Sequence, residues 1–262
     1  MRLIDSHAHL NADRFDDDLD RVVDAARTAG LERILVPGWN VRSSGRALEV
    51  VASRPWLDAA VGIHPHDAAK VDEAGWALIE AWARDDRVVA IGETGLDYFH
   101  VTRGRETEQK KTQRIFFAAQ AELALHLDLP LVIHTRDASA DTLTLLKEHG
   151  IRRAVIHCFS ENPEFARELM DWSSGIYFSF SGILTYQRAL AVQETARALP
   201  LGRILVETDA PFLVPQVLRD KYTVNEPAFT RHVMDFLKTL RIEPANVVEE
   251  TVWENSNRFY GV

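Results

Sequence analysis

The chain has 262 residues, of which 46% are hydrophobic and 26% are charged, and its formal net charge at pH 7 is −9. This composition is typical of a globular protein with a large core, and its acidic balance argues against broad, non-specific binding of duplex nucleic acid, which needs a basic surface. No apolar run reaches the length of a membrane span, and the N-terminus lacks a signal-peptide pattern, so we expect a cytoplasmic protein without a membrane partner. Cys158 is the only cysteine, so we expect no intramolecular disulfide.

Short β-branched runs alternate with amphipathic helical stretches along the whole chain. The predicted strands are residues 3–6, 33–36, 59–63, 88–92, 131–134, 154–157, 176–180 and 204–207. The helical patterns between them are residues 17–28, 73–84, 106–127, 138–149 and 163–172. Gly30 and Gly150 follow two of these, as glycines at helix C-termini commonly do.

Eight strands that are each followed by a helix are typical of an α/β fold of the closed TIM (β/α)8 barrel type. A doubly wound open sheet is the structural alternative. Residues 227–240 and 244–260 predict extra C-terminal helices, with Pro227 and Pro244 in their first turns. Since no linker, repeat or composition break is present, we expect residues 1–262 to form a single domain, and the sequence is compatible with a monomer.

Two histidines follow the first predicted strand in the segment Asp5-Ser6-His7-Ala8-His9. Successive side chains of a strand alternate between faces, so His7 and His9 are expected on the same side. Two imidazoles at this spacing suit a divalent metal at the end of a buried strand, although an isolated His-x-His also occurs in a frayed N-terminus.

Polar residues follow the other predicted strands in the same way. In a barrel these positions converge on one mouth, where such enzymes place their active sites. The segments are Gly62-Ile63-His64-Pro65-His66, Gly92-Glu93-Thr94-Gly95-Leu96-Asp97, His134-Thr135-Arg136-Asp137, His157-Cys158-Phe159 and Glu207-Thr208-Asp209-Ala210-Pro211. So many histidines and carboxylates at strand ends are hard to explain by solvation alone.

These strand ends supply enough ligands for two divalent ions that share a bridging carboxylate. The candidate ligands are His7, His9, Glu93, His134, His157 and Asp209. Glu93 is the candidate bridge, because it follows an apolar strand on which an unpaired carboxylate would be costly. The alternative role for Glu93 is a salt bridge. The alternative role for His134 or His157, each taken alone, is an imidazole that is hydrogen-bonded within the core.

Strand parity predicts which groups support the ligands. Asp5 shares a face with His7, and Glu207 shares one with Asp209, so either could accept the remaining N–H of a ligand imidazole. An internal ion pair is the competing interpretation.

Three further residues are assigned to substrate binding. These are His64, His66 and Arg136, of which Arg136 could hold an anionic oxygen with two hydrogen bonds. A helix-cap or loop hydrogen bond is an alternative role for His66 and Asp97.

Basic and aromatic residues are predicted near the same mouth. The basic ones are Arg103, Arg105, Lys110, Lys111, Arg219 and Lys221, which would give a cationic rim or, for Lys110 and Lys111, an ordinary solvated helix face. The aromatic ones are Trp39, Tyr98, Phe99 and Phe159, which could stack on bases or belong to the core.

Taken together, the six segments at strand ends resemble the TatD-like metal-dependent hydrolases, and the resemblance covers essentially the whole chain. It implies a TIM barrel of the amidohydrolase type, a two-metal site and, as in the best-known members, exonucleolytic cleavage of DNA from its 3′ end. By the family pattern His7, His9, Glu93 and Asp209 would hold one ion, while Glu93, His134 and His157 would hold the other.

The chain departs from the family pattern at two places near the mouth. Glu161 stands where the family often has glycine, and residues 218–224 replace an Arg-Gly-Lys-like segment before Asn225-Glu226-Pro227. Neither departure affects a proposed ligand, so both bear on substrate identity more than on catalysis.

The residues therefore predict a two-metal phosphodiesterase acting on the end of single-stranded DNA or another nucleic acid. Asp209 would orient the water that the ions activate and accept its proton, with Glu93 as the second catalytic residue. An amide, ester or lactone hydrolase with the same site and a non-catalytic metal-binding scaffold are the alternatives. Magnesium, manganese and zinc all remain compatible with this donor set.

Overall fold

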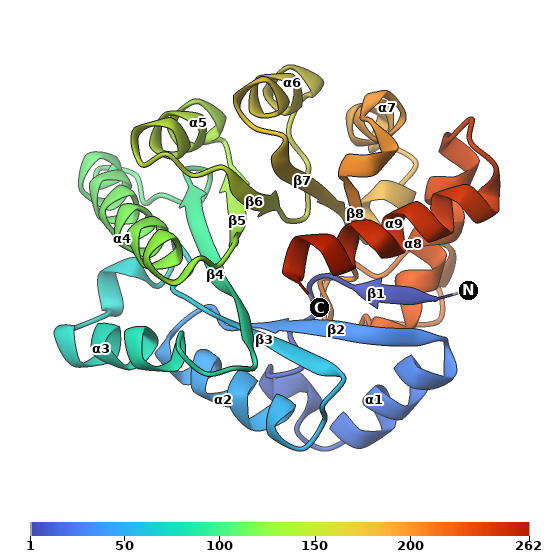
Figure 1. The fold of residues 1–262 in the computed structure, drawn as a ribbon, viewed down its shortest axis with the longest axis horizontal. Helices are drawn as coiled ribbons and strands as arrows, with labels where there is room; N and C mark the ends of the chain where they lie inside the picture. Colours follow the sequence, from blue (N-terminus) through green and yellow to red (C-terminus); the bar gives the residue numbers. More distant parts are fainter. Residues whose placement is uncertain (1, 262) are drawn as a thin grey trace.

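The computed structural model describes residues 2–261, and its strands and helices alternate around a barrel (Figure 1). The strands are β1 (Leu3–Asp5), β2 (Leu31–Pro37), β3 (Leu57–Val61), β4 (Val88–Asp97), β5 (Leu131–Arg136), β6 (Arg153–Ile156), β7 (Gly175–Phe180) and β8 (Ile204–Val206). The α-helices are α1 (Leu19–Thr28), α2 (Val41–Ala52), α3 (Glu73–Trp82), α4 (Glu106–Leu127), α5 (Ser139–Glu148), α6 (Pro163–Trp172), α7 (Leu190–Ala198), α8 (Thr230–Leu240) and α9 (Ala245–Tyr260). Within residues 2–261 no helix has the length and apolar character needed to cross a membrane.

All eight strands are parallel, and each pairs with the next one along the chain. Contacts between the first and last strands close the barrel: the Ser6 amide donates to the Val206 carbonyl at 3.1 Å, and Ala8 forms a β-bridge with Ala210. The predicted (β/α)8 barrel with extra C-terminal helices is thus confirmed, and the open-sheet alternative is wrong.

Strand β4 is longer than the sequence predicts, because it continues from Gly92 through Asp97. Its second half pairs with β5, with Gly95 opposite His134 and Asp97 opposite Arg136. The two backbones approach so closely that a Cβ on Gly95, whose φ is +125°, would lie 2.0 Å from the His134 carbonyl oxygen. Glycine therefore lets β4 carry two carboxylates, Glu93 and Asp97, directly beside His134.

Several helix boundaries also differ from the prediction. The sequence pattern did not single out α2 and α7, and the predicted helix 227–240 is divided into a 3₁₀ turn, Pro227–Phe229, followed by α8. Pro244 is the N-cap of α9 rather than a residue of its first turn. Its fixed φ is compatible with either position, so only the structure distinguishes them.

The end of the barrel opposite the strand C-termini is closed by side chains. Small and medium residues of successive strands, such as Ala60, Ala90 and Val132, fill the interior and pack against Phe259 and Tyr260 of α9. The Tyr260 hydroxyl donates to the carbonyl of Ser6 at 3.0 Å. The helix α9, red in Figure 1, therefore forms a floor under the barrel.

Candidate metal centre

The Glu93 carboxylate lies at the centre of a buried group of imidazoles, and its two oxygens face different sets of them. Oε2 lies 3.6 Å from Nε2 of both His7 and His9. Oε1 lies 2.9 Å from His157 Nε2 and 3.4 Å from His134 Nδ1. Strand β4 places this carboxylate between two groups of potential ligands.

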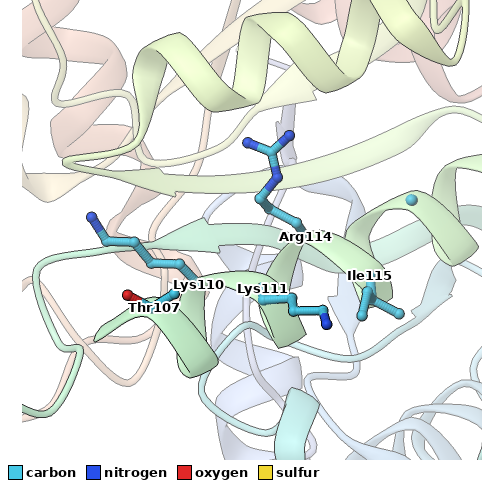
Figure 2. A pocket seen from close by; sticks show the side chains of 6 residues that line it. Thr107, Lys110, Lys111, Arg114 and Ile115 are labelled. Atoms are coloured by element: carbon cyan, nitrogen blue, oxygen red, sulfur yellow. The ribbon is translucent and has the colours of Figure 1, made fainter. Parts of the chain in front are cut away.

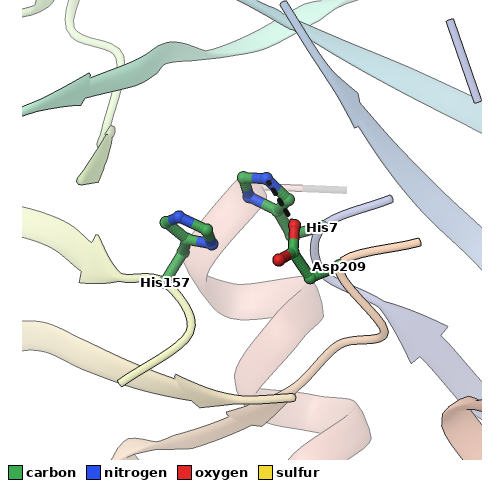
Figure 3. Close-up of side chains that lie close together, drawn as sticks. All are labelled: His7, His157 and Asp209. Atoms are coloured by element: carbon green, nitrogen blue, oxygen red, sulfur yellow. Dashed lines mark ion pairs between the residues drawn. The ribbon is translucent and has the colours of Figure 1, made fainter. Parts of the chain in front are cut away.

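The first group is formed by His7, His9, Asp209 and Oε2 of Glu93. The Nε2 atoms of His7 and His9 are 3.2 Å apart, and Asp209 Oδ1 lies 3.8 Å and 3.5 Å from them, respectively. Figure 3 shows the Asp209 carboxylate facing the ring of His7, with the ring of His157 on the other side. The His7 and His157 rings are stacked with centroids 3.9 Å apart. Ligand atoms of His7, His9 and Glu93 lie within 4.8 Å of one another, as do those of His7, His157 and Asp209, and imidazoles with carboxylates suit a divalent ion.

The second group is formed by His134, His157 and Oε1 of Glu93, and the structure adds His64 to it. His64 Nε2 lies 3.5 Å from Glu93 Oε1, about as close as the nitrogen of His134. The sequence assigned His64 to substrate, yet its ring is placed where it could also bind an ion. Its other nitrogen, Nδ1, accepts from the backbone N–H of His66 at 3.1 Å, which leaves Nε2 directed toward the carboxylate.

A buried polar atom without a hydrogen-bond partner supports a metal ion at this centre. Among the described residues, His157 Nε2 is fully buried and makes no hydrogen bond, although it is so close to Glu93 Oε1. An unpaired buried nitrogen is costly in the folded protein. The other nitrogens are held in place: His9 Nδ1 contacts the Pro37 carbonyl at 3.3 Å, and His157 Nδ1 contacts Glu207 Oε1 at the same distance. These contacts fix the rings so that their Nε2 lone pairs can face an ion.

The charges of the metal-free centre are strongly coupled. Burial opposes ionisation of Glu93, but His157 and His64 nevertheless hold the pKa of Glu93 well below its ordinary value. Burial also opposes protonation of His157, yet Glu93 and Glu207 raise the pKa of its imidazole well above the ordinary value. Without ions, protons on the imidazoles therefore balance the negative charge of the buried carboxylates.

This coupling predicts that ion uptake releases protons. His157 must be neutral to bind an ion, and Glu93 and Glu207 raise the pKa of its imidazole in the metal-free protein despite its burial, so we expect proton release on binding and an ion affinity that increases with pH until His157 is deprotonated. Calorimetric titration with Mn²⁺ in two buffers of different ionisation enthalpy measures the protons released. A binding enthalpy that is identical in the two buffers would contradict the prediction.

Glu207 is a fully buried carboxylate that supports the centre without facing its ions. Its Oε1 accepts from the Cys158 amide at 2.7 Å and lies beside His157 Nδ1. We expect Glu207→Gln to weaken ion binding by about 10- to 100-fold, because the amide no longer favours the required orientation and charge of His157. Dialysis against Mn²⁺ followed by elemental analysis checks this, and an unchanged affinity would show that Glu207 has only a packing role.

Asp5 does not take the role that strand parity allowed for it. Its oxygens accept from the backbone N–H groups of His7 and Thr208 and from the hydroxyls of Thr208 and Thr230, and it contacts no imidazole nitrogen among the described residues. Burial raises the pKa of Asp5 to about 7. Asp5 therefore joins β1 to the segment after β8, which places His7 next to Asp209.

A cavity of about 960 Å³ opens above the centre at the C-terminal ends of the strands. It is lined by Glu93, Asp209 and by all three residues assigned to substrate, namely His64, His66 and Arg136. The guanidinium of Arg136 lies 4.1 Å above the ring of Phe99, which is 56% exposed. The arrangement can hold an anionic group above two ion-binding groups.

Residues 4–261 match the family model described as TatD related DNase. The chain belongs to this family. It is thus a metal-dependent hydrolase of the TatD family, as the resemblance of its strand-end segments implies. The Bacillus subtilis protein YabD, described as an uncharacterized metal-dependent hydrolase, is 36% identical over 262 residues that cover 99% of each chain. The 3′-5′ ssDNA/RNA exonuclease TatD of Klebsiella pneumoniae is 33% identical, with 99% of this chain and 98% of that protein covered.

The fold agrees with a solved TatD homologue. The crystal structure of YJJV from Escherichia coli superposes with a TM-score of 0.90 at 28% identity, covering 100% of this chain and 98% of that one. One departure from the TatD pattern has a structural role near the mouth, because Glu161 accepts from the Ser139 hydroxyl at 2.8 Å. Asn225, which follows the second departure, is buried and donates to the Thr208 carbonyl, which holds the segment after β8.

Basic residues also gather on α4, beside the mouth of this TatD barrel. Figure 2 shows Lys110, Lys111 and Arg114 around a shallow hollow on the outer face of the helix. Two of them are tied to neighbouring groups: Lys110 Nζ lies 4.3 Å above the ring of Tyr98, and Arg114 pairs with Asp141 at 2.8 Å. A cationic rim made with Arg103 and Arg105 stays a prediction.

The aromatic residues differ in their surroundings. Trp39 lines the cavity and its ring centroid lies 5.0 Å from that of His9, so it is placed to contact a substrate. Phe159 is buried against Phe165 and Phe178, and its suggested role in base stacking is therefore wrong. Phe212, which the sequence did not single out, is 59% exposed and lines the cavity instead.

Proposed function

We propose that this protein is a two-metal phosphodiesterase that removes nucleotides from the 3′ end of single-stranded DNA or a related nucleic acid. The position of Glu93 carries the proposal, because its two oxygens face separate groups of imidazoles. Magnesium or manganese ions, or zinc, are the proposed cofactors. The substrate class is supported by TatD-family relatives that are named as ssDNA/RNA exonucleases.

The proposed ligands are distributed over the two groups. His7, His9 and Asp209 would hold one ion, His134 and His157 would hold the other, and Glu93 would contribute to both. When bound, the ions supply Lewis acidity that lowers the pKa of a water and offsets charge on the phosphoryl oxygens. The protein's part is to fix these side chains, through the contacts of Pro37 and Glu207 with two of the rings.

Asp209 is the proposed proton acceptor. Its carboxylate borders the cavity, and although burial opposes ionisation, the hydrogen bond from His9 and the charge of His7 lower its pKa. It is therefore ionised at neutral pH and can orient a water and take its proton.

The cavity wall is proposed to hold the nucleotide. Arg136 takes an anionic oxygen of the substrate, assisted by His64 and His66, while Trp39 and Phe212 offer ring faces to a base. The proposal includes a monomeric protein in the cytoplasm, where a single free thiol is compatible with the reducing conditions.

An assay on a 5′-labelled single-stranded DNA of about 20 nucleotides tests the function. The metal-free protein is supplied with magnesium, manganese or zinc in parallel, and the same DNA with phosphorothioate linkages at its 3′ end serves as the control. We expect a metal-dependent ladder that shortens from the 3′ end of the unmodified DNA only. If DNA and RNA stay intact under every ion while a small ester, amide or lactone is hydrolysed, the nucleic-acid assignment is wrong and the hydrolase remains.

A further inference from the structure

Asp97, at the C-terminal end of β4, is surrounded by three imidazoles. Its Oδ2 lies 2.7 Å from His100 Nδ1, 2.8 Å from His66 Nε2 and 3.3 Å from His134 Nε2. Its other oxygen, Oδ1, accepts from the backbone N–H of His100 at 3.0 Å. A carboxylate oxygen has two lone pairs, so three ring N–H groups cannot all donate to Oδ2 in good geometry. More nitrogen atoms converge on this oxygen than hydrogen bonding alone requires.

The carboxylate is held rigidly, whereas two of the rings are open to solvent. The side-chain amide of Gln113 binds both backbone groups of Asp97, accepting from its N–H and donating to its carbonyl at 2.9 Å each. The Asp97 side chain is 1% exposed, and those of His66 and His100 are 43% and 45% exposed. All three residues line the cavity above the Glu93 groups.

Two imidazoles and one carboxylate form a donor set that suits a divalent transition metal such as zinc, cobalt or manganese. The three donor atoms lie within 4.8 Å of one another. An ion about 2.1 Å from each ligand keeps the ligand atoms roughly 3 Å apart or slightly more. The two half-exposed rings need only a small movement to reach that separation, and their solvent side leaves coordination positions for water or a substrate anion.

We propose that His66, Asp97 and His100 form a third divalent-cation site, separate from the two ligand groups that meet at Glu93. Its position at the cavity wall lets it bind an anionic oxygen of a substrate that reaches the centre. This site does not depend on the substrate being a nucleic acid. The competing role is a hydrogen-bond network in which Asp97 only orients His134.

Counting bound ions distinguishes the two roles. Metal-free protein is dialysed against Co²⁺, bound cobalt is measured by elemental analysis, and the visible absorption of the bound ion reports its ligands. We expect three equivalents in the wild type and in His126→Ala, an exposed-histidine control on α4, and two in the His66→Ala/His100→Ala variant. Thermal unfolding of each variant, followed by circular dichroism, verifies that the two exposed substitutions leave the fold intact.

A second comparison isolates the proposed site. Glu93→Ala should lose cobalt from the centre and keep the equivalent that His66→Ala/His100→Ala removes, together with its absorption band. Equal cobalt content in the wild type and the double histidine variant, or loss of all cobalt in Glu93→Ala, would overturn the proposal. A protein that binds three ions but leaves DNA intact would disprove the proposed nuclease function while leaving the third site standing.

Discussion

Replacing Glu93 with glutamine reduces hydrolysis by on the order of 10³-fold or more, which is the largest effect we expect from a single substitution. Its two oxygens face different sets of imidazoles, so the amide removes a negative charge from each ion position at once. Several kcal/mol of Lewis-acid stabilisation in the transition state depend on these ions, and each 1.4 kcal/mol is about a factor of ten in rate. Turnover of a single-stranded DNA at saturating Mn²⁺, with bound metal measured in parallel, checks the result.

The matched control is Glu194→Gln, an exposed glutamate on α7 that does not line the cavity. It should retain the wild-type rate and metal content. Near wild-type turnover of Glu93→Gln with both ions retained would show that the two imidazole groups do not share a bridging carboxylate, and the proposed centre would have to be withdrawn.

The second large effect is expected for Asp209→Asn, which should lower kcat by about 10²- to 10⁴-fold. Asparagine keeps an oxygen that can face the ion near His7 and His9, but it cannot accept a proton from water. We therefore expect bound metal at saturating Mn²⁺ to remain near the wild-type level while the rate falls. This separates Asp209 from Glu93, whose substitution should reduce both quantities.

Single-turnover rates over a range of pH check this assignment. Because the hydrogen bond from His9 and the charge of His7 lower the pKa of Asp209 despite its burial, the side chain is already ionised near neutral pH, so the Asp209→Asn rate should lie below the wild-type rate by the same factor at every pH near neutrality. Asp86→Asn, at an exposed position in the loop before β4, is the control. An Asp209→Asn protein with wild-type kcat throughout this pH range would exclude Asp209 as the proton acceptor.

The barrel could be predicted from sequence because its strands are buried on both faces and are thus read as apolar runs between helical patterns. The sequence pattern did not predict helix α2, and the reason is physical. The helix contains Gly45, whose added Cβ would lie 3.1 Å from the ring of Trp82 in α3, so tight packing between helices favours a residue that weakens the local helix signal. The extension of β4 beyond Gly92 was missed because it depends on pairing with β5, a contact between distant parts of the chain.

The candidate ligands could be predicted because parallel strands bring their C-terminal ends to one mouth. What the sequence could not provide is the direction of each side chain there. Strand parity predicted that Asp5 shares a face with His7, but the structure shows that Asp5 binds backbone and hydroxyl donors. Likewise, the convergence of His100 with His66 on Asp97 depends on the fold of the segment after β4, although the spacing of Asp97 and His100 is a signal that could have drawn attention to it.

The floor made by Phe259 and Tyr260 has a consequence for a polymeric substrate. Because α9 closes the far side of the barrel, the chamber is blind-ended, and a strand cannot thread through it. On the proposed nuclease function, a released mononucleotide would leave by the opening through which the strand entered, so the shortened strand would withdraw before the next bond is cut. We therefore expect distributive rather than processive shortening: when labelled DNA is in large excess, all strands should lose their first nucleotides before any one of them becomes short.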